Sequence, residues 1–465
     1  MKRFSLVSMA HPPVVPRAAP SSDRSTSNHR RPDRAKASFR VPLLSFSQRG
    51  RRARITEPRF LLHAEPDVTK TLMTDKRWAA KYPWLGTGPV ATESCISPDY
   101  FERERTLIFR RSWLNVGRVD EIPERGQYFV RELAVCHTSI LIMRGKDGKI
   151  RGFHNVCAHR GNRLVPHERG QCPGKLMCNF HFWTFDTEGK LSWVPDEENF
   201  HGLDKSKLGL TPVRTDIWEG FIFVNLDDAG TESLEDYLDG VGKQLNGAPF
   251  GKLSRLRTFK VDERANWKVA IDAQNEIYHL PFQHRFTFPD AFVLKDNRYT
   301  RLFDVNLYKR HSVWSCEYNP DYKVSPLGAL LGRLDRLKDP PRFTQMIGDF
   351  DFFLVFPNMV ILLFKGAAWD FVVTYNFWPL AVDHTIWEIR YYYPPADNAG
   401  TRLNQEYGLC RLRDTLQEDA KAHEAIHAGL RSRAKRELQL QDDEICIRYF
   451  HKVVDDHAGL LEAAE

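Results

Sequence analysis

The chain has 465 residues, 42% of them hydrophobic and 27% charged, which is long enough for two domains with substantial cores and typical of a soluble globular protein. The net charge of +7 is local, because residues 1–60 carry fourteen Lys and Arg against three acidic residues, or +11, which leaves −4 for the rest. A mildly acidic folded part argues against nucleic-acid binding, and the longest uncharged apolar run, residues 352–364, is too short to cross a bilayer.

Residues 1–72 are rich in Pro, Ser and Arg with little core-forming periodicity, which predicts a disordered basic extension that does no chemistry. The Arg-rich, acid-poor composition is typical of an organelle transit segment, and the alternative is that translation starts at Met73. We expect a cytoplasmic location, with organellar import if the extension is translated.

Eight cysteines in this length are too sparse for a disulfide scaffold, and no secretory signal is apparent, so a reducing compartment is expected. Cys157, Cys172 and Cys178 nevertheless cluster. Clustered cysteines in such a compartment are more often metal ligands than disulfide partners.

Short strands are predicted from Trp113 onward, at residues 127–133, 138–144 and 150–156, with an Asp147-Gly148 turn between the second and third. This pattern places Cys157 and His159 in a loop just after a strand. A second unit repeats it, with Cys178 and His181 at a strand end, then a strand and a turn at Glu188-Gly189. Each of two loops therefore presents one Cys and one His.

The order of the candidate ligands along the chain distinguishes a zinc site from an iron–sulfur cluster. A zinc finger runs Cys, Cys, His, His with the histidines on a helix, whereas this chain runs C-x-H, eighteen residues, C-x₂-H without an apparent helix. An iron–sulfur cluster with two thiolates on one iron and two imidazoles on the other suits two such loops.

With its flanking "CAHRG" and "HFWTFDTEGKL", this segment resembles the Rieske [2Fe–2S] domain. The resemblance implies that Cys157 and Cys178 ligate one iron and that His159 and His181 ligate the other. Phe182 follows the second histidine where many members have Gly, and Cys172 lies in the spacer, off the pattern.

A second metal site is indicated by "NWKVAIDAQNEIYHLPFQH", where apolar residues from Trp267 to Tyr278 fall at helical spacing and predict a helix over 262–279 that ends near Pro281. Glu276 and His279 are three residues apart and share a face of that helix. His284 follows the break. The two histidines alone are equally consistent with an ordinary surface pair.

A third candidate ligand lies on a helix predicted at about 402–435, which carries an inward stripe. Asp419 occupies an inward position, and a carboxylate facing a core is costly unless it is paired or bound to metal. Two imidazoles and one carboxylate on one face of iron are typical of non-heme Fe(II) oxygenases. The stripe consists of Leu409, Leu412, Leu416, Asp419, His423, Ile426 and Leu430.

Together the two sites resemble the catalytic α subunit of Rieske non-heme iron aromatic-ring-hydroxylating oxygenases, over roughly residues 80–450. The resemblance implies Fe²⁺ on His279, His284 and Asp419, and a Glu276 that bridges a neighbouring subunit's Rieske histidine to His279. Many members have Asp at that position, so Asn275 and Asp272 are alternative polar neighbours.

An α+β fold follows from the resemblance: an all-β Rieske domain, then a helix-grip catalytic domain with a curved antiparallel sheet around a long C-terminal helix. The alternating runs "FVVTYNFW" and "TIWEIRYYY" are typical of a sheet covered on one face. The expected division is an N-terminal segment at 73–112, the Rieske domain at 113–226 and the mononuclear iron domain at 227–465.

The resemblance also implies O₂ as cosubstrate, electrons from a ferredoxin or an NAD(P)H-dependent reductase, a homotrimer with or without a small β subunit, and mono- or dioxygenation of an aromatic or other apolar small molecule. No G-x-G-x-x-G follows a strand, so NAD(P)H oxidation is assigned to a separate protein. A cage for a quaternary ammonium group is the alternative substrate site. Candidate pocket residues, each equally an ordinary core residue, are Phe353, Phe356, Phe364, Trp369, Phe371 and Tyr375.

Two other functions compete. "HEAIH", from His423 to His427 with Glu424 as base, matches the H-E-x-x-H pattern of zinc metalloproteases, although no third protease ligand is evident. A Rieske electron carrier without oxygenase activity would lack the second iron, and the large apolar C-terminal part argues against it.

Overall fold

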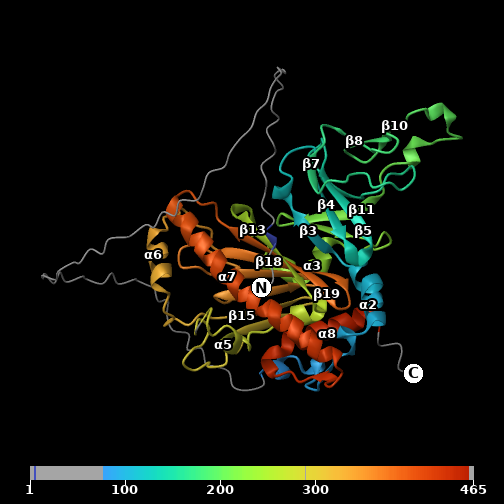
Figure 1. Ribbon diagram of the computed structural model, residues 1–465. Helices are drawn as coiled ribbons and strands as arrows, with labels where there is room; N and C mark the ends of the chain where they lie inside the picture. The colour runs from blue at the N-terminus through green and yellow to red at the C-terminus, as the bar shows by residue number, and fades with distance from the viewer. Residues whose placement is uncertain (1–4, 7–76, 289, 460–465) are drawn as a thin grey trace, which may run out of the picture. The chain divides into compact units, whose positions relative to one another are not determined.

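The computed structural model describes residues 5–6, 77–288 and 290–459 (Figure 1). The chain divides into two compact units, one of residues 1–7 and 73–465 and one of residues 8–72. The second unit, and with it nearly all of the extension expected to be disordered, lies outside the described residues. All of the described helices and strands belong to the first unit.

The C-terminal part is built on one antiparallel sheet. Its order along the sheet is β1 (Ser5–Leu6), β13 (Ser254–Glu263), β19 (His384–Tyr393), β18 (Phe371–Ala381), β17 (Met359–Phe364), β16 (Phe350–Val355), β15 (Ser312–Cys316) and β14 (Asp304–Leu307). Strands β14 to β19 follow one another as antiparallel neighbours, and β13 joins at the β19 edge. The connection from β13 to β14 is a crossover, because these consecutive strands lie toward opposite edges of the sheet.

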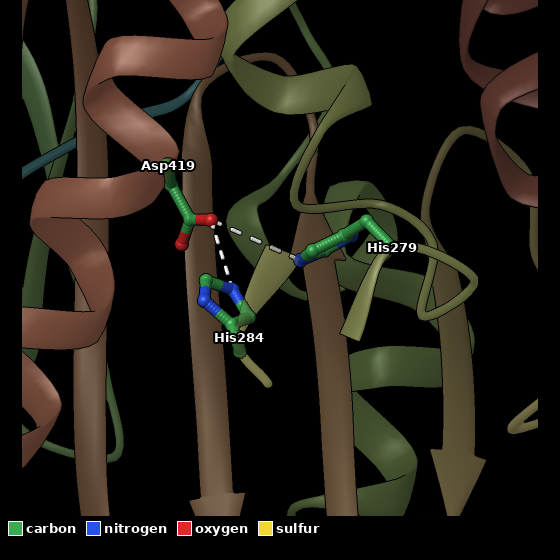
Figure 2. A group of neighbouring side chains, drawn as sticks. All are labelled: His279, His284 and Asp419. Atoms are coloured by element: carbon green, nitrogen blue, oxygen red, sulfur yellow. Dashed lines mark ion pairs between the residues drawn. The ribbon is translucent and has the colours of Figure 1, made fainter. Parts of the chain in front are cut away.

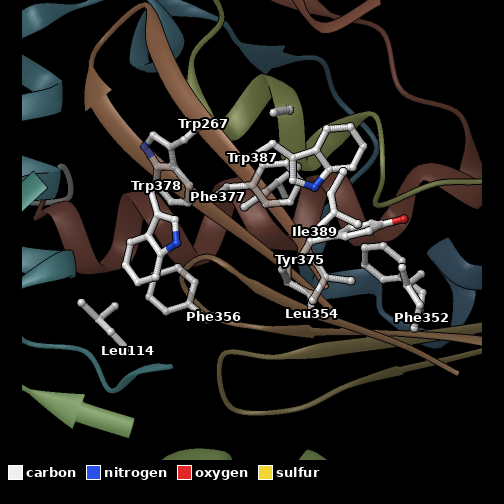
Figure 3. Packing of buried hydrophobic residues seen from close by; sticks show 14 of the residues in the cluster. Leu114, Trp267, Phe352, Leu354, Phe356, Tyr375, Phe377, Trp378, Trp387 and Ile389 are labelled. Carbon is white, nitrogen blue, oxygen red and sulfur yellow. The ribbon is translucent and has the colours of Figure 1, made fainter. Parts of the chain in front are cut away.

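Helix α7 (Ala399–Arg431) covers one face of this sheet and crosses in front of the strands in Figure 1. It begins where the Asn398 side chain accepts a hydrogen bond from the N–H of Thr401. Leu409, Leu416 and Ala420 pack from the helix into the aromatic core, part of which Figure 3 shows. That core includes Phe352, Leu354, Tyr375, Phe377, Trp387 and Ile389.

The N-terminal part consists of strands. A seven-stranded sheet has the order β3 (Leu114–Arg118), β12 (Phe221–Asn225), β11 (Pro212–Trp218), β6 (Ile150–His154), β5 (Thr138–Arg144), β4 (Gln127–Leu133) and β7 (Arg169–Gln171). Two smaller sheets are β10 (Leu191–Trp193), β9 (Thr184–Asp186), β8 (Lys175–Met177), and β2 (Val90–Ala91) with β20 (Glu437–Leu438). Strands β4 and β5 have the bounds predicted from the sequence, and the predicted α+β class is confirmed.

The helix predicted over 262–279 is wrong in its extent. Strand β13 continues to Glu263, and α4 (Trp267–Asp272) starts only after Asn266, whose side chain accepts from the N–H of Lys268 at 3.0 Å. Pro281 does not end this helix but lies in the first turn of a separate short helix, α5 (Leu280–Gln283), where a missing N–H costs nothing. The remaining helices are α1 (Arg77–Lys81), α2 (Pro98–Glu104), α3 (Leu234–Gln244), α6 (Pro326–Leu334) and α8 (Ile445–Ala458).

The segment that precedes β3 contacts the C-terminal part through buried polar groups. The indole of Trp78 donates to Asp443 at 3.0 Å, and Glu104 accepts from the indole of Trp267 at 2.9 Å. Glu104 also pairs with Lys268, and both side chains are fully buried. None of the helices in the described ranges combines the length and apolarity that a membrane crossing requires.

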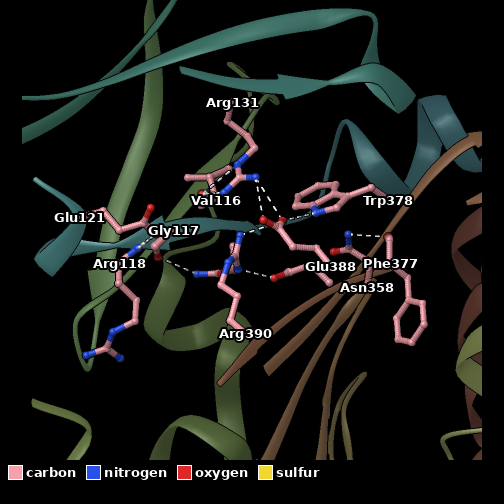
Figure 4. A network of polar contacts seen from close by, with 12 residues as sticks. Val116, Gly117, Arg118, Glu121, Arg131, Asn358, Phe377, Trp378, Glu388 and Arg390 are labelled. Carbon is pink, nitrogen blue, oxygen red and sulfur yellow. Dashed lines mark hydrogen bonds and ion pairs between the residues drawn. The ribbon is translucent and has the colours of Figure 1, made fainter. Parts of the chain in front are cut away.

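A buried charge network links the N-terminal sheets to the C-terminal sheet (Figure 4). Arg131 of β4 pairs with Glu388 of β19 at 3.1 Å, and Arg390, two residues along, reaches the same carboxylate at 2.8 Å. The indole of Trp378 donates to it as well. Burial opposes ionisation of Glu388, but Arg131 and Arg390 outweigh it and lower the pKa of this carboxyl well below its usual range.

Glu121 makes a second buried link, to Arg255 of β13 at 2.9 Å and to Arg169. Burial alone would raise the pKa of Glu121, but Arg255 and Arg169 lower it to about 2. Both carboxyls therefore have folded pKa values below their unfolded values. Their contribution to stability is present above about pH 4.3, the usual value for Glu, and is lost as pH falls toward the folded pKa.

Replacing Glu388 by Gln should leave two buried guanidinium groups without a counter-charge and lower the free energy of unfolding by about 3–5 kcal/mol at pH 7. Urea denaturation would measure this, with the exposed Glu188→Gln, paired only with Lys190, as a control within about 0.5 kcal/mol of the parent. The parent should lose stability between pH 5 and 2 more steeply than Glu388→Gln. Equal slopes would show that Glu388 is not ionised in the fold.

Candidate metal centres and substrate cavity

The three residues proposed as ligands of a mononuclear metal meet in the structure (Figure 2). His279 directly precedes α5 and His284 directly follows it, so this one-turn helix sets their spacing. Asp419 projects from α7, and its Oδ1 lies 3.8 Å from Nε2 of His279 and 3.0 Å from Nε2 of His284. One ligand atom from each residue lies within 4.8 Å of the other two.

Each histidine is oriented by a carboxylate on its other ring nitrogen. Glu276 contacts Nδ1 of His279, and Glu418 contacts Nδ1 of His284 at 2.7 Å. Such carboxylate–histidine pairs fix the ring and direct Nε2 toward a metal. The donor set of two imidazole nitrogens and one carboxylate oxygen fits Fe(II), with His284 and Asp419 buried and His279 half-buried.

Electrostatics of the three residues favour a charged cluster. Burial lowers the pKa of His279, but Glu276 and Asp419 outweigh it and raise the value to about 9. Burial likewise raises the pKa of Asp419, yet His284 and His279 hold it below its usual range. The Asp419 carboxylate is therefore ionised, as a metal ligand must be, whereas a metal on His279 would displace the proton that the raised pKa favours.

Two supporting residues were not predicted. Gln283 of α5 donates its amide to Oδ1 of Asp419 at 2.5 Å, and Glu418 accepts from the Thr287 hydroxyl at 3.0 Å as well as contacting His284. The only sequence signal was position, since Gln283 and Glu418 are immediate neighbours of two predicted ligands. Asn275, an expected alternative neighbour, instead donates to the carbonyl of Cys446 at 2.9 Å.

Asp272, the other expected alternative, pairs with His451 at 2.8 Å. Of the three polar residues considered beside His279, the structure brings only Glu276 to the imidazole. The longer Glu side chain reaches Nδ1 from a position three residues upstream.

The four residues expected to hold an iron–sulfur cluster lie on two loops with matching backbone conformations. One loop follows β6, and in it the N–H of Gly161 donates to the carbonyl of Cys157 at 3.0 Å. The other joins β8 to β9, and the N–H of Phe182 donates to the carbonyl of Cys178 at 2.9 Å. Gly161 has φ +71° and Phe182 has φ +57°, so Phe182 occupies the left-handed conformation that Gly takes in the first loop.

The loops bring the two cysteines together inside and the two histidines together near the surface. Both thiols are buried, while Nδ1 of His159 and Nδ1 of His181 lie 3.1 Å apart. Burial opposes the thiolate of Cys178, but the N–H of Phe180 and the amide of Asn162 lower its pKa. Two sulfurs, two nitrogens and hydrogen bonds to sulfur fit a histidine-ligated [2Fe–2S] cluster.

An apolar cavity of about 510 Å³ lies beside His279, His284 and Asp419. Its wall is rich in aromatic side chains, and the rings of Trp314 and Phe352 stack with their centroids 5.0 Å apart. The aromatic side chains that line it are Phe288, Phe292, Trp314, Tyr318, Tyr322, Phe350, Phe352, Phe364, Phe371, Tyr375 and Tyr407. Three of the six aromatic residues named from the sequence are among them, whereas Phe353, Phe356 and Trp369 are not.

The H-E-x-x-H pattern does not form a metal site within the described residues. His423 and His427 are buried on α7, but His423 pairs with Glu263 at 3.1 Å, and Glu424 accepts from the backbone N–H of Arg264 at 3.0 Å. The predicted stripe continues through His427 rather than Ile426, which is 44% exposed, because the helix period is 3.6 and not 3.5.

Comparison with known proteins assigns the same two parts. Residues 112–212 match the Rieske [2Fe-2S] domain, and residues 250–459 match the ring hydroxylating alpha subunit (catalytic domain). The carnitine monooxygenase oxygenase subunit of Acinetobacter baumannii is 34% identical over 186 residues, 39% of this chain and 49% of the relative. The chain thus spans about half the length of such relatives.

A longer match is the glycine betaine monooxygenase oxygenase subunit of Pseudomonas aeruginosa, 25% identical over 358 residues, 72% of this chain and 80% of that protein. Among solved structures, a quaternary ammonium Rieske monooxygenase in complex with an inhibitor shares the fold, with a TM-score of 0.66, 23% identity and coverage of 83% of this chain and 99% of that one.

Asp419→Ala should remove one iron per chain and leave the two irons of the Rieske cluster, because its carboxylate is one of the three candidate ligands. Metal analysis together with electron paramagnetic resonance of the reduced protein would show this. Asp414→Ala is the matched control, since Asp414 is exposed on the same helix and pairs with Arg413. Full iron content in Asp419→Ala would remove this residue from the site.

Proposed function

Because the chain belongs to the Rieske non-heme iron oxygenases as a catalytic α subunit, we propose that it uses O₂ and externally supplied electrons to hydroxylate a small, largely apolar molecule. One observation carries the proposal: two histidines and a carboxylate, each histidine backed by a carboxylate, open onto an apolar cavity. His279, His284 and Asp419 would hold Fe²⁺, and Cys157, Cys178, His159 and His181 would hold the [2Fe–2S] cluster.

When bound, the cluster supplies single electrons and the iron supplies the site at which O₂ is activated. The chain's own residues do the rest. Glu276 and Glu418 accept the Nδ1–H of His279 and His284 and so fix both imidazole tautomers. The aromatic wall excludes water and orients the substrate against the ligand residues.

The cavity is large enough for a substrate bigger than a single methylammonium group. A volume of about 510 Å³ with an aromatic wall suits a ring system, and the same wall offers π faces to a quaternary ammonium group. We favour an aromatic or similarly apolar body, with a quaternary ammonium compound as the second candidate because the Acinetobacter and Pseudomonas relatives act on carnitine and glycine betaine.

Electron delivery is proposed to occur between subunits of a homotrimer, with electrons from a ferredoxin or an NAD(P)H-dependent reductase. Large apolar side chains are exposed beside the Rieske histidines, at Phe180 and Phe182, and near Glu276, at Tyr278, Phe282 and Phe286. Two such surfaces suit burial against each other. A related structure is described in terms of inter-subunit electron transfer.

We propose the division into a Rieske domain at 113–226 and a mononuclear iron domain at 227–465, preceded by the segment at 73–112.

A cytoplasmic location is proposed because none of the eight cysteines forms a disulfide, as in a reducing compartment. A small β subunit is not needed for any residue of either site.

Glu276→Gln should retain both metal centres but lower substrate-dependent turnover by about 10- to 100-fold, because Glu276 orients His279 and is the residue proposed to bridge it to a neighbouring subunit's Rieske histidine. Single-turnover absorbance would follow reoxidation of the cluster. Glu424→Gln, a conservative change elsewhere in the same domain, should leave turnover unchanged, whereas a zinc metalloprotease would lose its general base. Unchanged reoxidation in Glu276→Gln would exclude the bridging role.

The proposal as a whole is tested by electron paramagnetic resonance of dithionite-reduced protein purified from Met73 onward. A rhombic signal of a histidine-ligated [2Fe–2S] centre is expected, followed by O₂ consumption with a surrogate reductase that depends on an added aromatic substrate. An iron-replete protein without this signal would contradict the assignment.

A further inference from the structure

A second space of about 390 Å³ adjoins the apolar cavity and differs from it in chemistry. Tyr322, Tyr407 and Arg411 line both spaces and therefore form the boundary between them. Beyond this boundary the outer space is more polar than the cavity, with Lys323, Ser325, Thr287 and Asp414 in its wall beside Phe286. The path from the histidines outward thus passes from aromatic side chains to a guanidinium group.

Arg411 is held in place but not neutralised. Its Nη2 donates to the carbonyl of Thr287 and, at 3.2 Å, to the hydroxyl of Tyr322, and its guanidinium carbon lies 4.7 Å from the ring centroid of Phe288. In the part of the chain that the structure describes, no carboxylate forms an ion pair with Arg411, and Nε and Nη1 have no hydrogen-bond partner. Two donors of a planar fork are therefore available to a ligand.

The carboxylates that line these two spaces interact with groups other than Arg411. Among the described lining residues, Glu276 and Asp419 belong to the histidine end, and Asp414 pairs with Arg413 at 2.6 Å. The hydroxyl of Tyr322 accepts from Arg411, so its own proton is available for an incoming acceptor. A positively charged substrate group would find no counter-charge at this boundary, whereas an anionic group would find a guanidinium and a phenol.

The distance between the two ends is set by the helix that carries both. Arg411 and Asp419 lie eight residues apart on α7, about 12 Å along its axis, and Thr415 and Leu416 line the cavity between them. A molecule whose anionic group contacts Arg411 therefore has room for an apolar body of ring-system size before it reaches the ligand residues.

We propose that Arg411, assisted by Tyr322, is a specificity-determining residue that binds an anionic group, a carboxylate or a sulfonate, at the outer end of a substrate whose apolar body fills the aromatic cavity. The inference rests on the proposed function only in that it calls the bound ligand a substrate. The binding of that ligand is measured without turnover. It narrows the substrate class from an apolar molecule to an amphipathic anion.

Isothermal titration calorimetry of the metal-loaded full chain with 2-naphthoate and its neutral counterpart 2-naphthamide tests the inference. The parent should bind 2-naphthoate about 10- to 100-fold more tightly, because a charge-assisted hydrogen bond in a site with little water discriminates by that factor. Arg411→Gln should lose this preference while its affinity for 2-naphthamide changes by less than about two-fold. Arg431→Gln, which alters an exposed arginine at the far end of the same helix and outside both spaces, is the control and should keep the preference.

Arg411→Lys keeps the charge without the planar fork and should retain only part of the preference. The inference is overturned if the parent binds both ligands equally, if it binds neither, or if Arg411→Gln and Arg411→Lys lose both ligands alike, which would show a structural role through Thr287. A protein that prefers 2-naphthoate but never consumes O₂ would contradict the proposed function alone, and an active oxygenase without the preference would contradict this inference alone.

Discussion

The packing of α7 against the eight-stranded sheet is the constraint on which the rest of the structure depends. Leu409, Leu416 and Ala420 bury one side of this helix in the aromatic core, and that orientation also places Asp419 in the interior. A lone carboxylate there would be costly. The two imidazoles and the Gln283 amide offset the lost hydration, so the contact that stabilises the domain also brings the three candidate metal ligands together.

A second constraint acts between the two parts of the chain. The pairs of Arg131 with Glu388 and of Arg255 with Glu121 are buried, and their net contribution to stability is modest compared with the cost of breaking them. The two pairs join β4 and η4 (Val119–Glu121) to β19 and β13. They lie beside a hydrophobic core to which both the seven-stranded and the eight-stranded sheet contribute side chains.

Charge is distributed unevenly around the cavity, and this has consequences for function. Acidic groups gather with the histidines at one end, Arg411 lies at the other, and aromatic side chains separate them over about two turns of α7. A cavity of this kind orients an elongated ligand as well as binding it, since its two ends meet opposite charge environments. Orientation decides which part of a bound ligand faces His279, His284 and Asp419.

The sequence by itself determined the strands β4 and β5, the long C-terminal helix, and the ligand candidates at 157, 159, 178, 181, 279, 284 and 419, because ligand chemistry and periodicity are local properties. It overestimated the helix before His279, since the pairing of β13 with β19 to Glu263 and the cap at Asn266 compete with helical spacing. Glu418 and Gln283 have no local signal beyond their position next to predicted ligands, and Arg411 has none. Only the tertiary structure decided them, because α5, α7 and the loop at Tyr322 meet through contacts between residues far apart in the chain.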